Sequence, residues 1–595
     1  MIKLTVNNKK VSAEEGMTIL EAAKMNNITI PNLCHLEGVH KIGSCRICVV
    51  EVEGSKTLQA ACVTNIKDNM VIYTNSARVR KARQVLYELM LSDHPKNCLN
   101  CIRNQHCEFQ QLGEIIQINT SRFEGAISKN KSDYSSPSIT RDTSKCLLCR
   151  RCVTVCNEIQ NIGILNVQKR GFNTVIAPAA EMPMDSANCI GCGQCTLVCP
   201  VGALVERDST EKVWEALNDK SKRVVIQTAP AVRAALGEEF GFQPGTVVTG
   251  KMVTALREMG FDDVFDTNFT ADLTIMEEGN ELLKRLRESL VGKNVSLPMI
   301  TSCSPGWIKF IEHNFPQQLE HLSTCKSPHM MLGALVKNFY AEKIGVDANN
   351  IFVVSVMPCT AKKFEITRPE MQKNGLADVD AVITTRELAK MIKKAGLKFK
   401  TLDDSSFDNP LGLSSGAADI FGVTGGVMEA ALRTVYEILT GRELPFENLH
   451  IKPLIGFERI KTVEIPVNDT VPSYREFEGI TLKVAAASGT FAAQKLMQEI
   501  RNGTSPYHFI EIMGCPGGCI NGGGQPKPVN ETIRQKRLEA IYQEDESKQL
   551  RKSHLNPALQ ELYAGFLKVP LGYKSHELLH TKYVKRGIYN EYLKK

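Results

Sequence analysis

The chain of 595 residues is too long for one hydrophobic core and predicts several domains. Its hydrophobic share of 43% and charged share of 23% are typical of a soluble protein, and the charges behind its net +7 are too scattered to favour nucleic-acid binding. No apolar run approaches the length of a membrane span, and the N-terminus lacks the apolar core of a signal peptide, so we expect a cytoplasmic protein that binds neither nucleic acid nor membrane. Twenty cysteines in a reducing compartment indicate metal ligation, not disulfides.

Residues 1–78 are expected to form a small, mainly β domain. The stretches KLTVNN and KKVSAEEG favour a hairpin, and MTILEAAKMNN favours a helix. Four cysteines follow in the order C-x10-C-x2-C-x13-C, a relative of the plant-type ferredoxin pattern with a longer first gap. Four thiolates in one small domain suit a [2Fe–2S] centre, with a structural zinc ion as the alternative. The candidate ligands are Cys34, Cys45, Cys48 and Cys62.

Residues 79–125 begin with a helical pattern, ARVRKARQVLYELMLSDH, that ends at His94. The three cysteines that follow cannot complete a tetrahedral set, so His94 is the leading fourth ligand and His106 competes with it. On spacing alone, zinc in a Cys3His site is the commoner interpretation, although imidazole also binds iron. The plain alternative is that His94 only closes the helix. The cysteines are Cys98, Cys101 and Cys107.

Residues 126–208 carry two copies of C-x2-C-x2-C-x3-C, the arrangement of bacterial ferredoxins with two [4Fe–4S] clusters. In that arrangement the fourth cysteine of each run binds the cluster of the other run. The first predicted ligand set is Cys146, Cys149, Cys152 and Cys199. The second predicted set is Cys189, Cys192, Cys195 and Cys156.

From about residue 209 to 530, β-rich segments alternate with helical ones, which predicts an α/β architecture with parallel strands. Three cysteine stretches fall in this region: TSCSPGW at 301–307, VMPCTAKK at 356–363 and EIMGCPGGCINGGG from residue 511. Glycines let a backbone approach a bulky inorganic group. Two cysteines are too few for a four-iron cluster, so we expect the three stretches to meet; two buried structural thiols are the plain alternative for the last stretch alone.

Two further sequence motifs resemble functional sites but are better explained by structural packing. The stretch GVTGG at 422–426 resembles a phosphate-binding turn only loosely, because it lacks the GxGxxG order, and a packing turn is favoured. The stretch HELLH, from His576 to His580, fits the HExxH helix of zinc metalloproteases, but no third ligand is evident and a redox protein is a poor setting for a peptidase. Residues 531–595 are charged and helical and are expected to wrap around the α/β core.

Together the three catalytic-region motifs and the ferredoxin motifs resemble those of [FeFe]-hydrogenases over nearly the whole chain, most closely the forms with one [2Fe–2S] and three accessory [4Fe–4S] centres. The resemblance implies a multidomain α+β and α/β fold. In chain order it comprises a β-grasp [2Fe–2S] domain, a His-ligated [4Fe–4S] segment, a two-cluster ferredoxin-like domain, an α/β catalytic domain and a C-terminal helical wrap. It also implies that the His94 set binds a [4Fe–4S] cluster instead of zinc.

The resemblance further implies an H-cluster, in which a cubane is joined through a cysteine sulfur to a two-iron unit bearing CO, cyanide and a dithiolate amine. Cys519 matches the bridging ligand, and Cys359 and Cys515 match cubane ligands. The best-known members have two adjacent cysteines in the first motif, one a ligand and one a proton relay, where this chain has Cys303 and Ser304. Simple register puts Ser304 at the ligand position. Because cubanes are normally held by thiolates, we nevertheless expect Cys303 to be the ligand and Ser304 to lie near the relay.

Other positions match the family by motif. A proton path from solvent is matched by Glu278, Glu281 and Ser323. Lys362 matches a lysine that hydrogen-bonds a cyanide, and Met357 and Met513 match methionines that line the pocket. Without the resemblance, surface carboxylates and core methionines are the plain interpretations.

The implied activity is the reversible reaction 2H⁺ + 2e⁻ ⇌ H2, with accessory clusters relaying electrons from ferredoxin or from NAD(P)- and flavin-binding partner subunits. No nucleotide or flavin motif is evident in the chain, so NAD(P) chemistry needs a partner, and separate maturation proteins must build the di-iron unit. Two alternatives stay open. One is a hydrogen sensor with slow turnover, and the other is a non-catalytic iron–sulfur scaffold or electron carrier without the di-iron unit.

Overall fold

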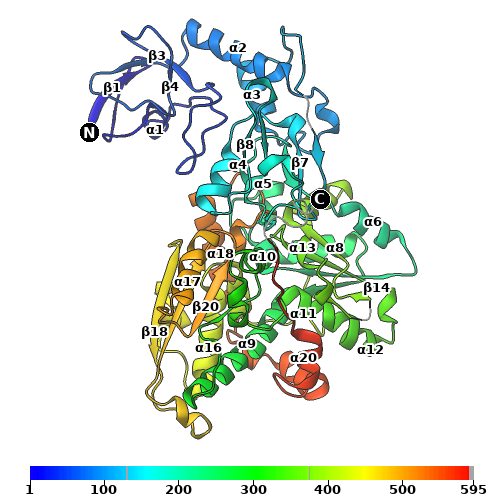
Figure 1. The fold of residues 1–595 in the computed structure, drawn as a ribbon. Helices are drawn as coiled ribbons and strands as arrows, with labels where there is room; N and C mark the ends of the chain where they lie inside the picture. Colours follow the sequence, from blue (N-terminus) through cyan, green and yellow to red (C-terminus); the bar gives the residue numbers. More distant parts are fainter. Residues whose placement is uncertain (129–130, 374, 588–595) are drawn as a thin grey trace. The chain divides into compact units, whose positions relative to one another are not determined.

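The computed structural model describes residues 1–128, 131–373 and 375–587, and the chain divides into two compact units (Figure 1). Unit 1 comprises Met1–Ala187 and Gln194–Val205, and unit 2 comprises Asn188–Gly193 and Glu206–Lys595. The short segment Asn188–Gly193 carries two of the cysteines expected to bind a cluster. None of the helices in the described part of the chain has the length and apolar character that crossing a membrane requires.

Unit 1 begins with a five-stranded sheet of order β2-β1-β5-β3-β4. The predicted hairpin is confirmed, because β1 pairs antiparallel with β2, and β1 also pairs parallel with β5. Helix α1 (Ile19–Met25) packs against β2 and begins at a capping box, in which Thr18 and Glu21 satisfy each other's backbone N–H. The strands are β1 (Ile2–Val6), β2 (Lys9–Ala13), β3 (Val49–Val52), β4 (Gln59–Ala60) and β5 (Val71–Tyr73).

The rest of unit 1 consists of short elements between cysteine loops. Helix α2 (Ala77–Ser92) begins where the Ser76 hydroxyl accepts a hydrogen bond from Val79 N, and it ends just before His94. Arg83 ties α2 to the first sheet by donating to the Ile47 and Val49 carbonyl oxygens at 3.0 and 2.8 Å. The other elements are α3 (Glu108–Ile116), β6 (Ser132–Asp133), β7 (Ile139–Asp142), α4 (Arg151–Thr154), η3 (Val155–Ile159), β8 (Asn166–Gln168), β9 (Val175–Ala177), α5 (Gln194–Val198) and β10 (Leu204–Glu206).

Unit 2 contains two four-stranded sheets, ordered β12-β11-β14-β17 and β13-β20-β19-β18. All pairs are parallel except β18 with β19, so the predicted α/β architecture is confirmed. The two main hydrophobic cores each form around one of these sheets. The strands are β11 (Arg223–Thr228), β12 (Asp263–Asp266), β13 (Met299–Ile300), β14 (Ile351–Met357), β17 (Ala381–Thr384), β18 (Ile460–Pro466), β19 (Thr481–Ser488) and β20 (Phe509–Met513), beside a small pair, β15 (Gln372–Lys373) and β16 (Leu376–Ala377).

Parallel pairing brings the motif stretches to the carboxyl ends of the strands. Cys359 follows the end of β14 by two residues, Cys515 follows the end of β20 by two, and Cys303 follows β13 by three. Ligand sites in open α/β sheets form at this edge, because the loops that leave neighbouring strands meet there. The pairing of β13 with β20 therefore accounts for the meeting of the Cys303 and Cys515 loops, which are more than 200 residues apart, whereas Cys359 follows β14 of the other sheet.

Helices cover both sheets. The longest, α9 (Thr267–Leu290), lies beside α16 (Gly426–Thr440) and packs on α11 (Pro328–Leu335) (Figure 1). The other helices before residue 531 are α6 (Thr210–Asn218), α7 (Pro230–Arg233), α8 (Thr249–Glu258), α10 (Pro305–Asn314), α12 (Ala341–Ile344), α13 (Lys362–Glu365), α14 (Thr385–Lys394), α15 (Gly416–Asp419) and α17 (Thr490–Arg501).

The C-terminal segment is helical, as expected, and packs on the core of unit 2. Its helices are α18 (Glu531–Ser547), α19 (Pro557–Leu562) and α20 (Tyr573–Leu579), which contact α15, α9 and α11 respectively. Buried Arg433 of α16 anchors α18 by donating to both carboxylate oxygens of Asp545, at 2.9 and 2.8 Å, and it also binds Glu429 at 2.7 Å. The last part of the expected wrap, 588–595, lies outside the described residues.

An Arg433→Met variant is expected to lose about 3–5 kcal/mol of stability, because it removes the buried cation shared by Asp545 and Glu429 and leaves them only Arg551 and His450 as partners. The matched control is Arg442→Met, whose partner Asp469 is exposed, and for which a loss of about 1 kcal/mol or less is expected. Denaturant unfolding of both variants measures the difference. Equal losses would show that the buried network does not anchor the C-terminal segment.

Candidate metal centres and catalytic site

The four cysteines of the first domain gather in one place. Cys48 Sγ lies 3.3 Å from Cys62 Sγ, and Cys34 N donates to Cys45 Sγ at 3.4 Å. Hydrogen bonds from Cys45 and Cys62 lower the pKa of the Cys34 thiol, which links the two halves of the set. Three of the four are buried. The domain therefore presents four thiols to a single metal centre, which fits a [2Fe–2S] cluster.

His94 and its three cysteines line one cavity of unit 1, whereas His106 is absent from the residues that line it. The Nδ1 atom of His94 is buried and has no hydrogen-bond partner among the described residues. Burial lowers the pKa of His94 to about 4, so the ring is neutral and can offer a lone pair. An unpartnered imidazole nitrogen beside three thiols fits a metal ligand better than a helix terminator.

The first double-cluster set also converges. Cys146, Cys149, Cys152 and Cys199 all line a second, narrow cavity of unit 1. Burial raises the pKa of Cys146 to about 11 and also raises the pKa of Cys152 well above its ordinary value. This lining agrees with the prediction that Cys199, from the second cysteine run, completes the ligand set of the first run.

The second set is distributed over more elements. Cys156 lies in η3 and Cys195 in α5, and these two elements pack together within unit 1. Cys189 and Cys192 lie in the segment Asn188–Gly193, which belongs to unit 2. In unit 2 the Gly191 carbonyl accepts a hydrogen bond from Thr360 Oγ1 at 2.6 Å, and the Cys192 carbonyl oxygen lies 4.0 Å from Cys515 Sγ. The backbone that carries Cys192 is therefore in contact with the catalytic loops.

In unit 2, the three catalytic-region stretches share one cavity. Its lining includes all four expected H-cluster cysteines together with the expected pocket residues; these are Cys303, Ser304, Met357, Cys359, Lys362, Met513, Cys515 and Cys519, with Pro230 beside them. Glycines allow the backbones of these loops to pack closely against one another. A Cβ at Gly518, whose φ is +92°, would lie 2.7 Å from Thr424 N, and one at Gly522 would lie 2.3 Å from the Pro358 carbonyl oxygen.

Cys303 and Ser304 have different surroundings. The Ser304 hydroxyl accepts a hydrogen bond from Gly514 N at 3.1 Å, which holds it beside Cys515. Burial raises the pKa of the Cys303 thiol well above its ordinary value, and the nearby Glu278 carboxyl raises it further. Both side chains line the catalytic cavity, but Ser304 is hydrogen-bonded to the loop of Cys515, whereas the Cys303 thiol is influenced electrostatically by Glu278.

The expected proton-path residues form a continuous hydrogen-bonded row. Ser323 Oγ donates to Glu281 at 3.1 Å, and Ser323 also hydrogen-bonds Glu278. Arg285 donates to Glu281 at 2.6 Å. Burial raises the pKa of Glu278 to about 8, so this carboxyl is mostly protonated at neutral pH. A row that alternates carboxyl and hydroxyl groups can pass a proton inward toward Cys303.

Lys362 is held toward the catalytic cavity by a buried charge network. Its Nζ donates to the Cys303 carbonyl oxygen at 3.0 Å and to Glu365 at 2.8 Å. His329 Nε2 lies 2.7 Å from the same carboxylate, and burial lowers the pKa of His329 to about 4. Burial opposes ionisation of Glu365, but Lys362 and His329 outweigh it and lower the pKa of Glu365 to about 2. Sequence reasoning missed Glu365 and His329; the KKFE spacing of Lys362 and Glu365 was the available signal.

Glu511 explains the glycine turn at 422–426. Its carboxylate accepts hydrogen bonds from Gly425 N and Met428 N at 2.7 and 2.8 Å, at the N-terminus of α16. Burial raises the pKa of Glu511 to about 7. The turn therefore binds a side chain of the same unit in the place where a phosphate-binding turn would hold its ligand, and the packing interpretation is confirmed. Because Glu511 lies four residues before Cys515, this contact also positions the cysteine loop.

These features define a redox protein with several iron–sulfur centres and a separate catalytic pocket. Five family models match it: "Iron only hydrogenase large subunit, C-terminal domain" over residues 222–523, "Iron hydrogenase small subunit" over 531–586, "2Fe-2S iron-sulfur cluster binding domain" over 1–77, "NADH-ubiquinone oxidoreductase-G iron-sulfur binding region" over 83–122 and "4Fe-4S dicluster domain" over 145–203. The chain belongs to the iron-only, or [FeFe]-, hydrogenase family.

Several relatives match along their full length. The chain is 50% identical to the NADP-reducing hydrogenase subunit HndD of Solidesulfovibrio fructosivorans, over 98% of this chain and 99% of that protein. It is 42% identical to iron hydrogenase 1 of Clostridium pasteurianum, over 98% and 100%. Among solved structures, apo [FeFe]-hydrogenase HydA1 from Chlamydomonas reinhardtii matches with a TM-score of 0.57 and 44% identity, over 63% of this chain and 99% of that chain.

Proposed function

We propose that this chain is the hydrogen-converting subunit of an [FeFe]-hydrogenase that interconverts H2 with protons and electrons. The observation that carries the proposal is the shared cavity of unit 2, in which Cys359, Cys515 and Cys519 meet from segments far apart in the sequence. Lys362 faces the same cavity and is held there by Glu365.

The H-cluster, when bound, supplies the iron site at which protons and electrons combine. Cys359, Cys515 and Cys519 would hold it. One hydrogen bond and one electrostatic effect support a reversal of the roles expected for the first motif: Gly514 N holds the Ser304 hydroxyl beside Cys515, and the Glu278 carboxyl raises the pKa of Cys303. We therefore assign the fourth cubane position to the Ser304 oxygen and the terminal proton relay to Cys303.

The chain's own residues would conduct protons. Glu281 receives a proton at its carboxylate, where Arg285 and Ser323 orient it, and Ser323 passes it to Glu278. Glu278 is mostly neutral at pH 7 and can donate to Cys303 while it is reloaded from Ser323. The cavity lining excludes bulk water from the last step, because Met357 and Met513 form part of its wall.

Electrons would travel through one [2Fe–2S] and three [4Fe–4S] centres held by the cysteine sets described above and His94. The segment that carries Cys189 and Cys192 supports an exit toward the catalytic cluster, because the Cys192 carbonyl oxygen lies 4.0 Å from Cys515 Sγ. An added Cβ at Gly193 would lie 2.3 Å from Thr360 Oγ1, so the close approach of this segment depends on glycine.

The electron partner is proposed to be an NAD(P)-linked, flavin-containing set of subunits, with ferredoxin as the alternative. The name of the relative from Solidesulfovibrio fructosivorans, an NADP-reducing hydrogenase subunit, supports the first. Because the chain has no evident nucleotide motif, the pyridine nucleotide would bind a partner chain. Maturation proteins for the di-iron unit and a cytoplasmic location stay predictions.

Infrared spectroscopy and turnover of the matured protein test this proposal. We expect vibrations of CO and cyanide ligands, together with H2 evolution from reduced viologen or ferredoxin. A Cys359→Ala variant should lose both signals while the absorption of the accessory clusters persists. Diatomic-ligand bands with very slow turnover would indicate the sensor alternative, and accessory clusters without those bands would indicate the scaffold.

A further inference from the structure

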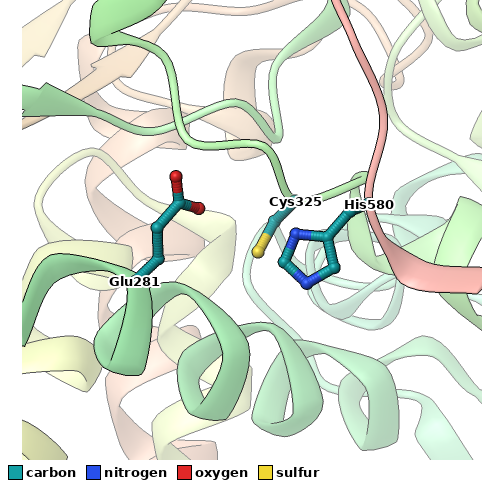
Figure 2. A group of neighbouring side chains, drawn as sticks. All are labelled: Glu281, Cys325 and His580. Carbon is teal, nitrogen blue, oxygen red and sulfur yellow. The ribbon is translucent and has the colours of Figure 1, made fainter. Parts of the chain in front are cut away.

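Three side chains of different metal-binding types converge outside the catalytic cavity. Glu281 projects from α9 toward Cys325 and His580, which lie on neighbouring segments (Figure 2). A carboxylate oxygen, the sulfur and a ring nitrogen all lie within 4.8 Å of one another. An antiparallel bridge between Cys325 and His580 sets this arrangement, with Thr581 N donating to the Thr324 carbonyl and Lys326 N to that of Leu579, each at 2.7 Å. The backbone therefore fixes two of the three groups.

His580 has the orientation of a metal ligand. Its Nε2 lies 3.2 Å from the buried carboxylate of Glu277, which also accepts from Tyr563 Oη at 2.6 Å and Leu571 N at 2.8 Å. The other ring nitrogen of His580, Nδ1, lies 2.7 Å from Thr324 Oγ1. A carboxylate behind the far nitrogen is the usual support of a zinc-binding histidine.

The charges and distances suit a divalent cation. Glu277 and Glu281 place two carboxylates at the cluster, and Arg285 is bonded to the second of them. Cys325 is fully buried. In a tetrahedral zinc site, bonds of about 2.0–2.3 Å separate the ligand atoms by roughly 3.3–3.8 Å. The three ligand atoms here lie within 4.8 Å of one another, so zinc binding requires them to approach by about 1 Å. Thiol, imidazole and carboxylate together favour zinc over calcium or magnesium.

We propose that Glu281, Cys325 and His580 form a site for a zinc-type divalent cation, and that occupancy immobilises Glu281 and blocks proton delivery. The site itself is independent of the proposed hydrogenase function; only the effect on turnover rests on it. The second histidine of the HELLH stretch is therefore a ligand from the C-terminal segment, and its partners come from α9 and the 321–327 loop. His576, the first histidine, is exposed and its ring is tilted against that of His580, with ring centroids 4.4 Å apart, so it marks the side open to solvent.

The binding test uses the purified holoprotein with all its iron clusters and Zn²⁺ alone as the probe. We expect one zinc ion per chain after gel filtration and an X-ray absorption spectrum with one sulfur at about 2.3 Å and nitrogen or oxygen at about 2.0 Å. Cys325→Ala and His580→Gln should abolish that stoichiometric zinc, whereas His576→Gln, the matched control, should retain it. Absence of zinc, absence of a sulfur neighbour, or unchanged zinc in Cys325→Ala would overturn the site.

The turnover test measures H2 evolution against Zn²⁺ concentration. Cys325→Ala and His580→Gln should need at least about tenfold more zinc for half-inhibition than the unmodified chain or His576→Gln. If zinc binds stoichiometrically but does not inhibit H2 evolution, the proposed block of proton delivery is wrong, whereas the metal site itself stands. If the protein evolves no H2 at all, the hydrogenase proposal fails, while the stoichiometry and the absorption spectrum still decide the metal site.

Discussion

A Cys303→Ala variant is expected to assemble the four-iron part of the catalytic cluster and to lose H2 turnover by about 10²–10⁴-fold, the usual contribution of a positioned acid–base group. The reason is geometric. Cys303 lies within the field of Glu278, the innermost carboxyl of the proton row, whereas the Ser304 hydroxyl is bonded to Gly514 N beside Cys515. Iron content, cluster spectroscopy and viologen-driven H2 evolution measure the two effects separately.

Ser304→Ala is the reciprocal variant and should show the opposite pattern. Removing the oxygen should alter the spectrum of the cubane, or its assembly, and Ser304→Cys should restore a stable cubane with a thiolate ligand. If instead Cys303→Ala abolishes the cubane and Ser304→Ala leaves its spectrum unchanged, the sequence expectation that Cys303 is the ligand is correct. The pair therefore decides between two assignments that differ by one residue.

The accessory centres could be predicted from sequence because most of their ligands are local. In the run from Cys146 to Cys156, spacing alone places several sulfurs on one loop and helix turn, and Cys199, which lines the same cavity, belongs to a second copy of the same pattern. The alternation of strands and helices likewise predicted parallel sheets, and parallel pairing brings loops together at the carboxyl ends of strands. Hydrophobic periodicity and cysteine spacing predict these features because both depend on residues that are close together in the chain.

What sequence could not supply is the direction of single side chains in loops. Cys303 and Ser304 are adjacent, yet Glu278 influences the first electrostatically and the loop of Cys515 hydrogen-bonds the second, and no periodicity distinguishes them. Nothing in the sequence distinguishes Glu511, although its carboxylate fixes the glycine turn. His580 was set aside for lack of a third ligand nearby in sequence; the structure brings Glu281 and Cys325 to it from about 300 and 255 residues away.

A Glu278→Gln variant is expected to lose H2 turnover by about 10²–10⁴-fold with its clusters intact, because an amide cannot release and regain a proton as a carboxyl does. Glu278 occupies the only step between Ser323 and Cys303 within the described hydrogen-bonded row. The matched control is Glu288→Gln, on the same helix α9 but toward its exposed end, which should evolve H2 at the unmodified rate. Iron content and viologen-driven turnover separate loss of proton transfer from loss of clusters.

The pKa of Glu278 gives this prediction a pH dependence with a definite sign. Burial raises that pKa from 4.5 to about 8, so the folded protein holds more protons than the unfolded chain between these values, and stability falls as pH rises through the window. Glu278→Gln removes this pH-dependent contribution to stability. Compared with the unmodified chain at the same pH, the variant should therefore be more stable near pH 8 than it is near pH 5, while its turnover stays low at both values. In the unmodified chain, H2 evolution should decline above about pH 8, where Glu278 loses the proton it must donate. Turnover that survives in Glu278→Gln, or that keeps the same high-pH decline, would place the inner proton donor elsewhere.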